Sequence, residues 1–416
     1  MRVLLSTIGS RGDVQPLVAL ALELRKLCEV RMCVPPDFRE WIEGLGIPVV
    51  PIGPELRATA AGRATASAPS AASAPSASAA PAAPPSPEQR RQMAEATIAA
   101  QFPAITSAAE GCDVIVAATA LQMAARSVAE TMGIPYVFAA YCPAVLPSPY
   151  HAPPPGPGQP PATAGNRELW ARDAERFNEL FGAALDSHRA SIGLAPVGDV
   201  RSHVFTDRPW LAADPVLGPW PEDGERTVVQ TGAWILRDER PLSPELEAFL
   251  AAGEPPVYFG FGSMRAPGDL ARVMVGSARA LGRRAILSRG WAGLAPVDGE
   301  PDCLSVGEVN QQALFGRVAA VVHHGGAGTT TAAARAGAPQ VVIPQLYDQH
   351  YWAGRVQDLG IGVAHAPGAP AAGSLTSALK QALRPDVAAR ARTVAARVRI
   401  DGARTAAQRL MTLAQG

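Results

Sequence analysis

A strand, a glycine turn and a helix follow one another near residue 325, and they restrict how this chain can fold. The pattern predicts a buried strand over Val318–Val322, a turn containing Gly325, Gly326 and Gly328, and a helix over Thr329–Arg335. Glycines let a ligand approach the backbone and direct several N–H groups at one point, while the helix dipole adds positive potential there. The stretch therefore predicts a site for a phosphate or diphosphate.

Side chains of the same stretch add hydrogen-bond donors to this site. We expect His324 and a hydroxyl of Thr329 or Thr330 to contribute. Neighbouring residues at the end of a strand point to opposite sides, so we expect His323 to lie in the core. The alternative is a strand–helix turn that needs glycine only for its geometry. Two adjacent histidines before two adjacent glycines are more than such a turn requires.

Short apolar runs alternate with helical patterns along both halves of the chain. Residues 3–52 read as strand, helix, strand, helix, strand, and a second run of this kind covers residues 256–343. This order predicts an α/β fold with two doubly wound, Rossmann-like domains and a cleft between them. Ligands of such sheets bind at the carboxyl ends of the strands. The turns expected to face the cleft are Gly9–Asp13, Gly262–Ser263, His324–Thr330 and Asp348–Gln349.

Changes in composition suggest where the domains begin and end. We predict a first domain over 1–220, a linker over 221–240, a second domain over 241–390 and a final helix over 391–416. We further expect one long helix over 166–191 and an unbroken helical tail over 385–413. The segment 58–87 is built of Ala, Ser, Pro and Thr, which bury too little apolar surface to fold alone, so we predict a loop there.

Charge and cysteine content exclude several classes of partner. The chain carries 37 basic and 37 acidic residues, so neither nucleic acid nor an anionic membrane is an expected partner. Apolar runs are too short for a membrane span, and the first residues turn polar too soon for a signal peptide. Five cysteines without a CxxC pair indicate neither a disulfide framework nor a zinc site. We therefore expect a cytoplasmic protein.

Longer motifs run along nearly the whole chain: Gly9–Asp13, Arg31–Asp37, Ser187–Leu194, Gln230–Leu236, Gly260–Ser263, Ser288–Trp291, Gly307–Asn310, His323–Thr330 and Asp348–Gln349. Together they resemble the nucleotide-sugar-dependent glycosyltransferases of the two-Rossmann-domain (GT-B) type, family 1. Within that type they are most similar to the enzymes that glycosylate glycopeptide antibiotic aglycones of the vancomycin and teicoplanin class. The resemblance implies that the first domain binds the acceptor, the second binds the donor, and the final helix packs back on the first domain.

The resemblance implies that Asp13 is the general base, at a position where many relatives carry histidine. A carboxylate can take the proton of an acceptor hydroxyl as that oxygen attacks the anomeric carbon. A phenol, with a pKa of about 10, needs less help than an alcohol, so a weak base suffices. From spacing alone, an N-cap of the first helix is an equally good reading of Asp13.

The other implied roles concern the nucleotide-sugar donor. The diphosphate is expected at Ser10, Ser263, His324, Gly325, Gly326, Gly328 and Thr329. Fixed N–H donors stabilise the leaving diphosphate in place of a metal ion, and the chain has no acidic DxD cluster. By resemblance, Val309 offers its backbone to the pyrimidine, Gln311 its side chain to the ribose, and Asp348 and Gln349 theirs to sugar hydroxyls. For this last pair, a helix N-cap is the alternative.

The sequence thus predicts an inverting, metal-independent, monomeric glycosyltransferase without a bound cofactor. It moves a hexose, glucose or N-acetylglucosamine being favoured, from a UDP-sugar to a phenolic hydroxyl of a glycopeptide aglycone. The alternatives are a dTDP-deoxysugar transferase that acts on an already glycosylated glycopeptide or another aromatic natural product, a nucleotide-sugar epimerase, and a non-catalytic helper of the same fold. A nicotinamide-dependent oxidoreductase is disfavoured, because the turn Gly9–Gly12 lacks the third glycine of the dinucleotide fingerprint.

Overall fold

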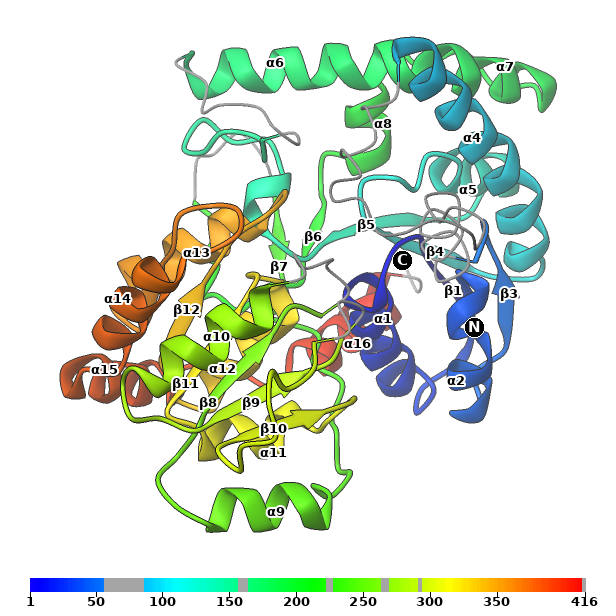
Figure 1. Cartoon of the computed structure of the whole chain (residues 1–416). Helices are drawn as coiled ribbons and strands as arrows, with labels where there is room; N and C mark the ends of the chain where they lie inside the picture. Colours follow the sequence, from blue (N-terminus) through cyan, green and yellow to red (C-terminus); the bar gives the residue numbers. More distant parts are fainter. Residues whose placement is uncertain (56–85, 156–163, 222–226, 263–268, 291–293, 414–416) are drawn as a thin grey trace, which may run out of the picture.

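The computed structural model describes residues 1–55, 86–155, 164–221, 227–262, 269–290 and 294–413. These residues form two parallel β-sheets, each with helices on both faces (Figure 1). The predicted α/β fold with two Rossmann-like domains is confirmed. Within the described residues, the helices are all too short or too polar to span a membrane.

The first sheet has seven parallel strands in the order β3-β2-β1-β4-β5-β6-β7. In chain order they are β1 (Arg2–Thr7), β2 (Glu29–Val34), β3 (Val49–Pro51), β4 (Val114–Ala118), β5 (Tyr136–Ala140), β6 (Trp210–Leu211) and β7 (Val229–Gln230). Leu5 in β1 lies in register with Met32 in β2 and Val116 in β4, and all three side chains are fully buried. The central strands are apolar throughout because helices cover the sheet on both sides.

Helices divide between the two faces of the first sheet. One face is covered by α1 (Arg11–Leu24), α2 (Arg39–Gly44) and α16 (Gly402–Leu413), and the other by α4 (Pro87–Ala109), α5 (Ala125–Met132), α7 (Ala183–Ser191) and α8 (Val200–Phe205). Because side chains alternate along a strand, Leu5 packs under α1 while Leu4 packs on the α4 side. α6 (Asn166–Phe177) runs into α7 through the π-helical turn η3 (Asn178–Gly182).

The second sheet has six parallel strands in the order β10-β9-β8-β11-β12-β13. They are β8 (Val257–Gly260), β9 (Ala285–Ser288), β10 (Cys303–Val306), β11 (Ala320–His323), β12 (Gln340–Val342) and β13 (Gly362–Ala364). α10 (Leu270–Arg279) and α14 (Ala372–Ala382) pack on one face, and α9 (Pro244–Ala251), α11 (Gln311–Leu314) and α12 (Ala327–Arg335) pack on the other. β11, which leads into the His-Gly turn, lies in the middle of this sheet, between β8 and β12.

The two domains meet along α13 (Gln349–Asp358). The ring of Trp352 on this helix is buried close to Gly218 and Pro143 of the first domain. One turn further on, Arg355 donates from Nε to the carbonyl of Leu217 at 2.9 Å. Apolar residues of α13 therefore belong to the same buried cluster as the α4 side of the first sheet.

Two predictions about the connections between the domains need correction. β7 lies inside the segment 221–240, which we expected to be a linker, and pairs with β6 at the edge of the first sheet. The tail is not one helix, because six residues separate the end of α15 (Pro385–Ala395) from the start of α16 at Gly402. At this break the chain crosses to the first domain, where the N–H of Arg399 donates to Asp214 at 2.8 Å. α16 then packs along α1 (Figure 1).

Candidate active site

The first β–α turn folds a carboxylate back onto its own backbone. β1 ends at Thr7, Gly9 adopts a φ of +141°, and Ser10 is the N-cap of α1. The N–H of Ser10 donates to Oδ2 of Asp13 at 2.7 Å, and its hydroxyl donates to the same oxygen at 3.2 Å. A Cβ on Gly9 would lie 2.3 Å from that oxygen, so only glycine fits there. Asp13 therefore closes a capping box from inside the helix, whereas the predicted alternative made it the N-cap itself.

Asp13 is held in an environment that suits a proton acceptor. Its side chain is half-buried, and its main-chain carbonyl accepts a hydrogen bond of 3.0 Å from the hydroxyl of Tyr141. Burial raises the pKa of Asp13 to about 6. The hydrogen bonds from Ser10 favour the charged form and lower the pKa, but their effect is smaller than that of burial. The carboxylate is thus largely ionised at neutral pH and still basic enough to take a proton.

A second carboxylate, from the other domain, lies close enough to Asp13 to interact with its charge. We call the region between the two domains around this pair the cleft. Asp348 precedes α13 and accepts a hydrogen bond of 3.1 Å from Nε1 of Trp352, so its side chain does not cap the helix. Burial and, to a smaller extent, the negative charge of Asp13 together raise the pKa of Asp348 to about 6. The cleft between the two domains therefore carries one acidic side chain from each of them.

The loop before Asp348 is braced by Gln349. Its side-chain oxygen accepts hydrogen bonds from the backbone N–H groups of Gln345 at 2.8 Å and Leu346 at 3.0 Å. Tyr347, between them and Asp348, has a φ of +50°, which is unusual for a residue other than glycine, and its side chain is exposed. Gln349 therefore has a structural task in this loop, in addition to the sugar contact expected from the sequence.

The His-Gly turn joins the centre of the second sheet to α12. His323 is fully buried, with Nε2 2.9 Å from Oε1 of Gln340, and its Nδ1 accepts the N–H of Gly325 at 3.1 Å. Gly325 has a φ of +95°, and a Cβ there would lie 2.8 Å from Val342 and 3.0 Å from the carbonyl of Gln349. The prediction that His323 points into the core is confirmed, and the turn lies directly against the start of α13.

His324 points the other way, toward the glycines that flank the cleft. A Cβ on Gly262 would lie 3.2 Å from its ring, and one on Gly326 would lie 2.8 Å from Nε2. Burial lowers the pKa of His324 to about 4, so the imidazole is neutral at pH 7 and carries one N–H donor. Its Nδ1 is buried and has no hydrogen-bond partner in the part of the chain that the structure describes.

Among the described residues, no side chain caps the backbone N–H groups in the first turn of α12. Gly326 is the N-cap and makes no side-chain hydrogen bond, and the first turn has no acidic residue. Thr330 is buried, and its hydroxyl donates back to the carbonyl of Gly326 at 2.9 Å. The sequence analysis expected a hydroxyl of either Thr329 or Thr330 at the diphosphate. Thr329 is half-buried, and its hydroxyl does not make the hydrogen bond to Gly326 that occupies Thr330. An anion can therefore approach the helix end.

The turn after β10 carries the residues expected to hold the nucleoside. Val309 and Gln311 are half-buried, and Nε2 of Gln311 lies 3.5 Å from the hydroxyl of Tyr258. Between them, Asn310 donates to the carbonyls of Asp238 at 2.9 Å and Arg240 at 2.7 Å. Asn310 thus ties this turn to the chain that enters the second domain. Ser263, the remaining predicted diphosphate ligand, lies outside the described residues.

Three residues at the cleft were not predicted from the sequence. Tyr141 and Trp352 act through contacts between segments far apart in the chain, which no local pattern reveals. Arg11 lies within the Gly9–Asp13 motif, and its guanidinium pairs with Glu308 of the other domain at 2.8 Å and stacks 4.8 Å from the ring centroid of Trp41. Only the presence of Arg11 in a recognised motif could have drawn attention to it.

Known proteins match this chain along its whole length. Residues 3–148 match the glycosyltransferase family 28 N-terminal domain, and residues 295–408 match the C-terminal domain of proteins like erythromycin biosynthesis protein CIII. Glycosyltransferase GtfE of Amycolatopsis orientalis is 54% identical over 415 residues, which cover 99% of this chain and 97% of that protein. The vancomycin aglycone glucosyltransferase of the same organism is 51% identical, with the same coverage of both chains.

The chain belongs to the GT-B glycosyltransferases. Another relative from that organism, a dTDP-epi-vancosaminyltransferase, is 46% identical over 403 residues, covering 95% of this chain and 93% of that one. The solved structure of the glycotransferase of kitacinnamycin shares the fold, with a TM-score of 0.71 at 21% identity over 99% of this chain and 98% of that chain. The family inferred from the sequence motifs and the enzyme class, a nucleotide-sugar hexosyltransferase, are confirmed.

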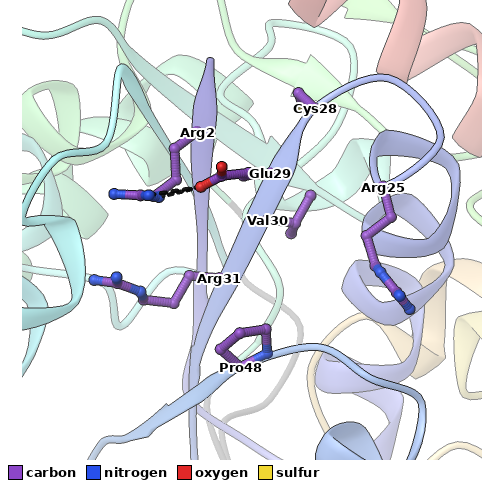
Figure 2. Close-up of a pocket in the computed structure, with 7 residues that line it drawn as sticks. All are labelled: Arg2, Arg25, Cys28, Glu29, Val30, Arg31 and Pro48. Atoms are coloured by element: carbon purple, nitrogen blue, oxygen red, sulfur yellow. Dashed lines mark hydrogen bonds and ion pairs between the residues drawn. The ribbon is translucent and has the colours of Figure 1, made fainter.

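A separate pocket of this glycosyltransferase lies away from the cleft. Figure 2 shows that its lining surrounds the start of β2 and includes Arg2, Arg25, Cys28, Glu29, Val30, Arg31 and Pro48. Arg2 is paired with Glu29 at 2.6 Å, and Arg31 donates to the carbonyl of Ala108. These residues sit at the amino ends of the strands, whereas ligands of doubly wound sheets bind at the carboxyl ends. None of the predicted site residues lines this pocket.

Proposed function

We propose that this enzyme transfers a hexose from a UDP-sugar to a phenolic hydroxyl of a glycopeptide antibiotic aglycone, with inversion and without a metal ion. One observation carries the proposal: Asp13 of the first domain interacts with the charge of Asp348 in the second. The His-Gly turn that leads into the uncapped end of α12 lies against the start of α13, directly after Asp348. A relative at 51% identity that is named a vancomycin aglycone glucosyltransferase supports the acceptor class. Another at 54% identity, named a glycosyltransferase, supports the class of reaction.

The acceptor side of the reaction rests on Asp13. Its Oδ2 is engaged by Ser10, so we assign the acceptor proton to Oδ1. As this proton moves to Asp13, the acceptor oxygen forms a bond to the anomeric carbon, and the bond from that carbon to the diphosphate breaks on the opposite face. The charge that develops on the leaving diphosphate is stabilised at the start of α12.

The donor side rests on the second domain. We assign the diphosphate to His324, to the backbone of Gly325, Gly326 and Gly328, and to the hydroxyl of Thr329, with Ser10 and Ser263 as further contacts. Val309 and Gln311 are assigned to the base and ribose. Asp348 accepts hydrogen bonds from sugar hydroxyls, and Gln349 adds to this contact while it braces the loop.

The second candidate is a dTDP-deoxysugar donor with an already glycosylated glycopeptide, because a relative at 46% identity is named a dTDP-epi-vancosaminyltransferase. A deoxygenated sugar would leave the half-buried Asp348 with fewer hydroxyl partners, which is costly. For this reason we favour a hydroxyl-rich hexose. We further propose a monomeric, cytoplasmic enzyme in which the first domain binds the acceptor and the second binds the donor.

Mass spectrometry of the product tests this proposal. Purified enzyme is incubated with a vancomycin- or teicoplanin-type aglycone and, in separate reactions, UDP-glucose, UDP-N-acetylglucosamine or a dTDP-deoxyhexose, with and without chelator. We expect the mass of one hexose or N-acetylhexosamine to be added from a UDP-sugar, with unchanged yield when chelator is present. Transfer from the dTDP-deoxyhexose alone, to an already glycosylated glycopeptide that is tested in parallel, would favour the second candidate. Consumption of donor without any glycosylated product would point to an epimerase or a hydrolase.

A further inference from the structure

One tyrosine ties the first turn of α1 to the middle of the first sheet. Tyr141 directly follows β5, and its hydroxyl donates to the main-chain carbonyl of Asp13 at 3.0 Å. Its ring meets Trp234 edge to face, with centroids 6.1 Å apart. Nε1 of Trp234 in turn donates to the hydroxyl of Thr231 at 3.0 Å. Contacts therefore hold both the ring and the hydroxyl of Tyr141.

The turn that receives this hydrogen bond needs support. Pro16 stands inside α1 and has no N–H, so the carbonyl of Gly12 lacks the helical hydrogen bond that residue 16 would otherwise give. The capping box joins Ser10 to the side chain of Asp13, but it does not fix where the whole turn lies relative to the sheet. The Tyr141 bond does, because it runs to the backbone of Asp13 from a neighbouring part of the domain core.

We propose that Tyr141 is a positioning residue that holds the carboxylate of Asp13 at its place in the cleft. This inference rests on the proposed role of Asp13 as the base. Tyr141 touches neither substrate in this account and acts only through the backbone of Asp13. Loss of its hydroxyl loosens the turn, lets water reach the carboxylate and misaligns the base by a fraction of an ångström, to which proton transfer is sensitive.

The same strand supplies a matched control. Tyr136, at the start of β5, is also half-buried, and its hydroxyl donates to the main-chain carbonyl of Val204 at 3.0 Å. Tyr136→Phe and Tyr141→Phe therefore remove the same kind of hydrogen bond, one at each end of β5. Only the second lies next to the cleft. Equal decreases in Tm would show that the two substitutions destabilise the fold to the same extent.

The experiment follows the titration of Asp13 and the rate of transfer in the intact enzyme. Carboxyl-labelled aspartate, with the Asp13 signal assigned by its loss in Asp13→Asn, reports the pKa without any need for turnover. Among the described residues, the titratable groups that interact with Asp13 are Asp348, which precedes α13, and Tyr141 itself. In Tyr141→Phe we expect the Asp13 titration to move to lower pH and kcat to fall about tenfold, with little change in the acceptor KM. Tyr136→Phe is expected to match the wild type in all three quantities.

Two further variants test whether Tyr141 acts through Asp13. If Tyr141 acts through Asp13, Tyr141→Phe has no additional effect on the rate in an Asp13→Ala background. 3-Fluorotyrosine at position 141 retains the donor, so it is expected to keep the wild-type titration, and it serves even if Tyr141→Phe does not fold. Identical Asp13 titrations and rate profiles in Tyr141→Phe and Tyr136→Phe would overturn the inference. A shifted titration in an enzyme that transfers no sugar would instead uphold the positioning role and refute the proposed function.

Discussion

The two domains use the same turn from strand to helix in opposite ways. In each, a central strand ends in a glycine turn that starts a helix, and Asp13 in α1 stands at the same third helical position as Thr329 in α12. The first helix end binds its own carboxylate through the N–H of Ser10. The second has a glycine N-cap and no acidic residue in its first turn. One turn therefore presents a base, and the other can bind an anion from outside.

This contrast shows that the glycine turn alone does not define a phosphate site. Both turns offer N–H groups and the positive end of a helix dipole. What separates them is one side chain, which either occupies that positive potential or leaves it accessible.

Asp13→Asn removes the base and keeps the turn. The amide oxygen of asparagine can still accept the N–H of Ser10, so we expect the fold to persist while kcat falls by about 10²–10⁴-fold, the usual range for a general base. Steady-state kinetics at pH 7.5 with a phenolic acceptor measure the loss. A variant that keeps a third or more of the wild-type kcat would rule out Asp13 as the base.

Thr329→Asp places a carboxylate at the start of α12, as Asp13 does at the start of α1. The new carboxylate would accept the backbone N–H groups of its own helix end and repel a diphosphate. We expect the Kd for UDP to rise about 100-fold, the size of a lost hydrogen bond to a charged group plus repulsion. Thr329→Asn has the same shape without the charge and is the control. Equal affinities of the Asp and Asn variants would show that the anion does not bind at this helix end.

Thr329→Ala and Thr330→Ala separate two neighbouring hydroxyls. Thr329 is assigned to the diphosphate, whereas the hydroxyl of Thr330 bonds to the carbonyl of Gly326 in its own helix. Calorimetry should show UDP binding weakened about tenfold by Thr329→Ala and unchanged by Thr330→Ala. The opposite ranking would exchange their roles.

The smallest expected effect concerns pH. The pKa of Asp13 is raised to about 6, so kcat/KM should increase as pH rises through about 6 and level off above it, because the base must be ionised. A raised folded-state pKa also means that Asp13 contributes stability below about pH 4, and that this contribution is lost as pH rises through about 6. Melting curves should therefore show Asp13→Asn gaining stability relative to the wild type between pH 4.5 and 7.5. A constant difference in Tm would contradict the raised pKa.

Much of the architecture was predictable because parallel strands covered on both faces are apolar throughout. The alternation of strands and helices expected over residues 3–52 and 256–343 is present in the structure. The burial of His323 followed from side-chain alternation alone. The spacing of Ser10 and Asp13 is that of a capping box, so their hydrogen bond could also have been inferred from the sequence.

The contacts that complete the cleft were not predictable from local patterns. The bond from Tyr141 to Asp13 joins residues 128 positions apart, and Arg355 reaches Leu217 over 138 positions. Such pairs depend on how the elements pack, which periodicity does not encode. The break between α15 and α16 has the same origin, because the tail must leave one domain to reach the other.

The division of tasks between the two turns is tested most directly by titrating UDP into Asp13→Asn and Thr329→Asp side by side in a calorimeter. We predict that Asp13→Asn binds UDP as tightly as the wild type, although it transfers almost no sugar. We predict that Thr329→Asp binds UDP about 100-fold more weakly than the wild type. If Asp13→Asn loses UDP binding while Thr329→Asp keeps it, the carboxylate turn and the open turn do not have the tasks assigned to them here.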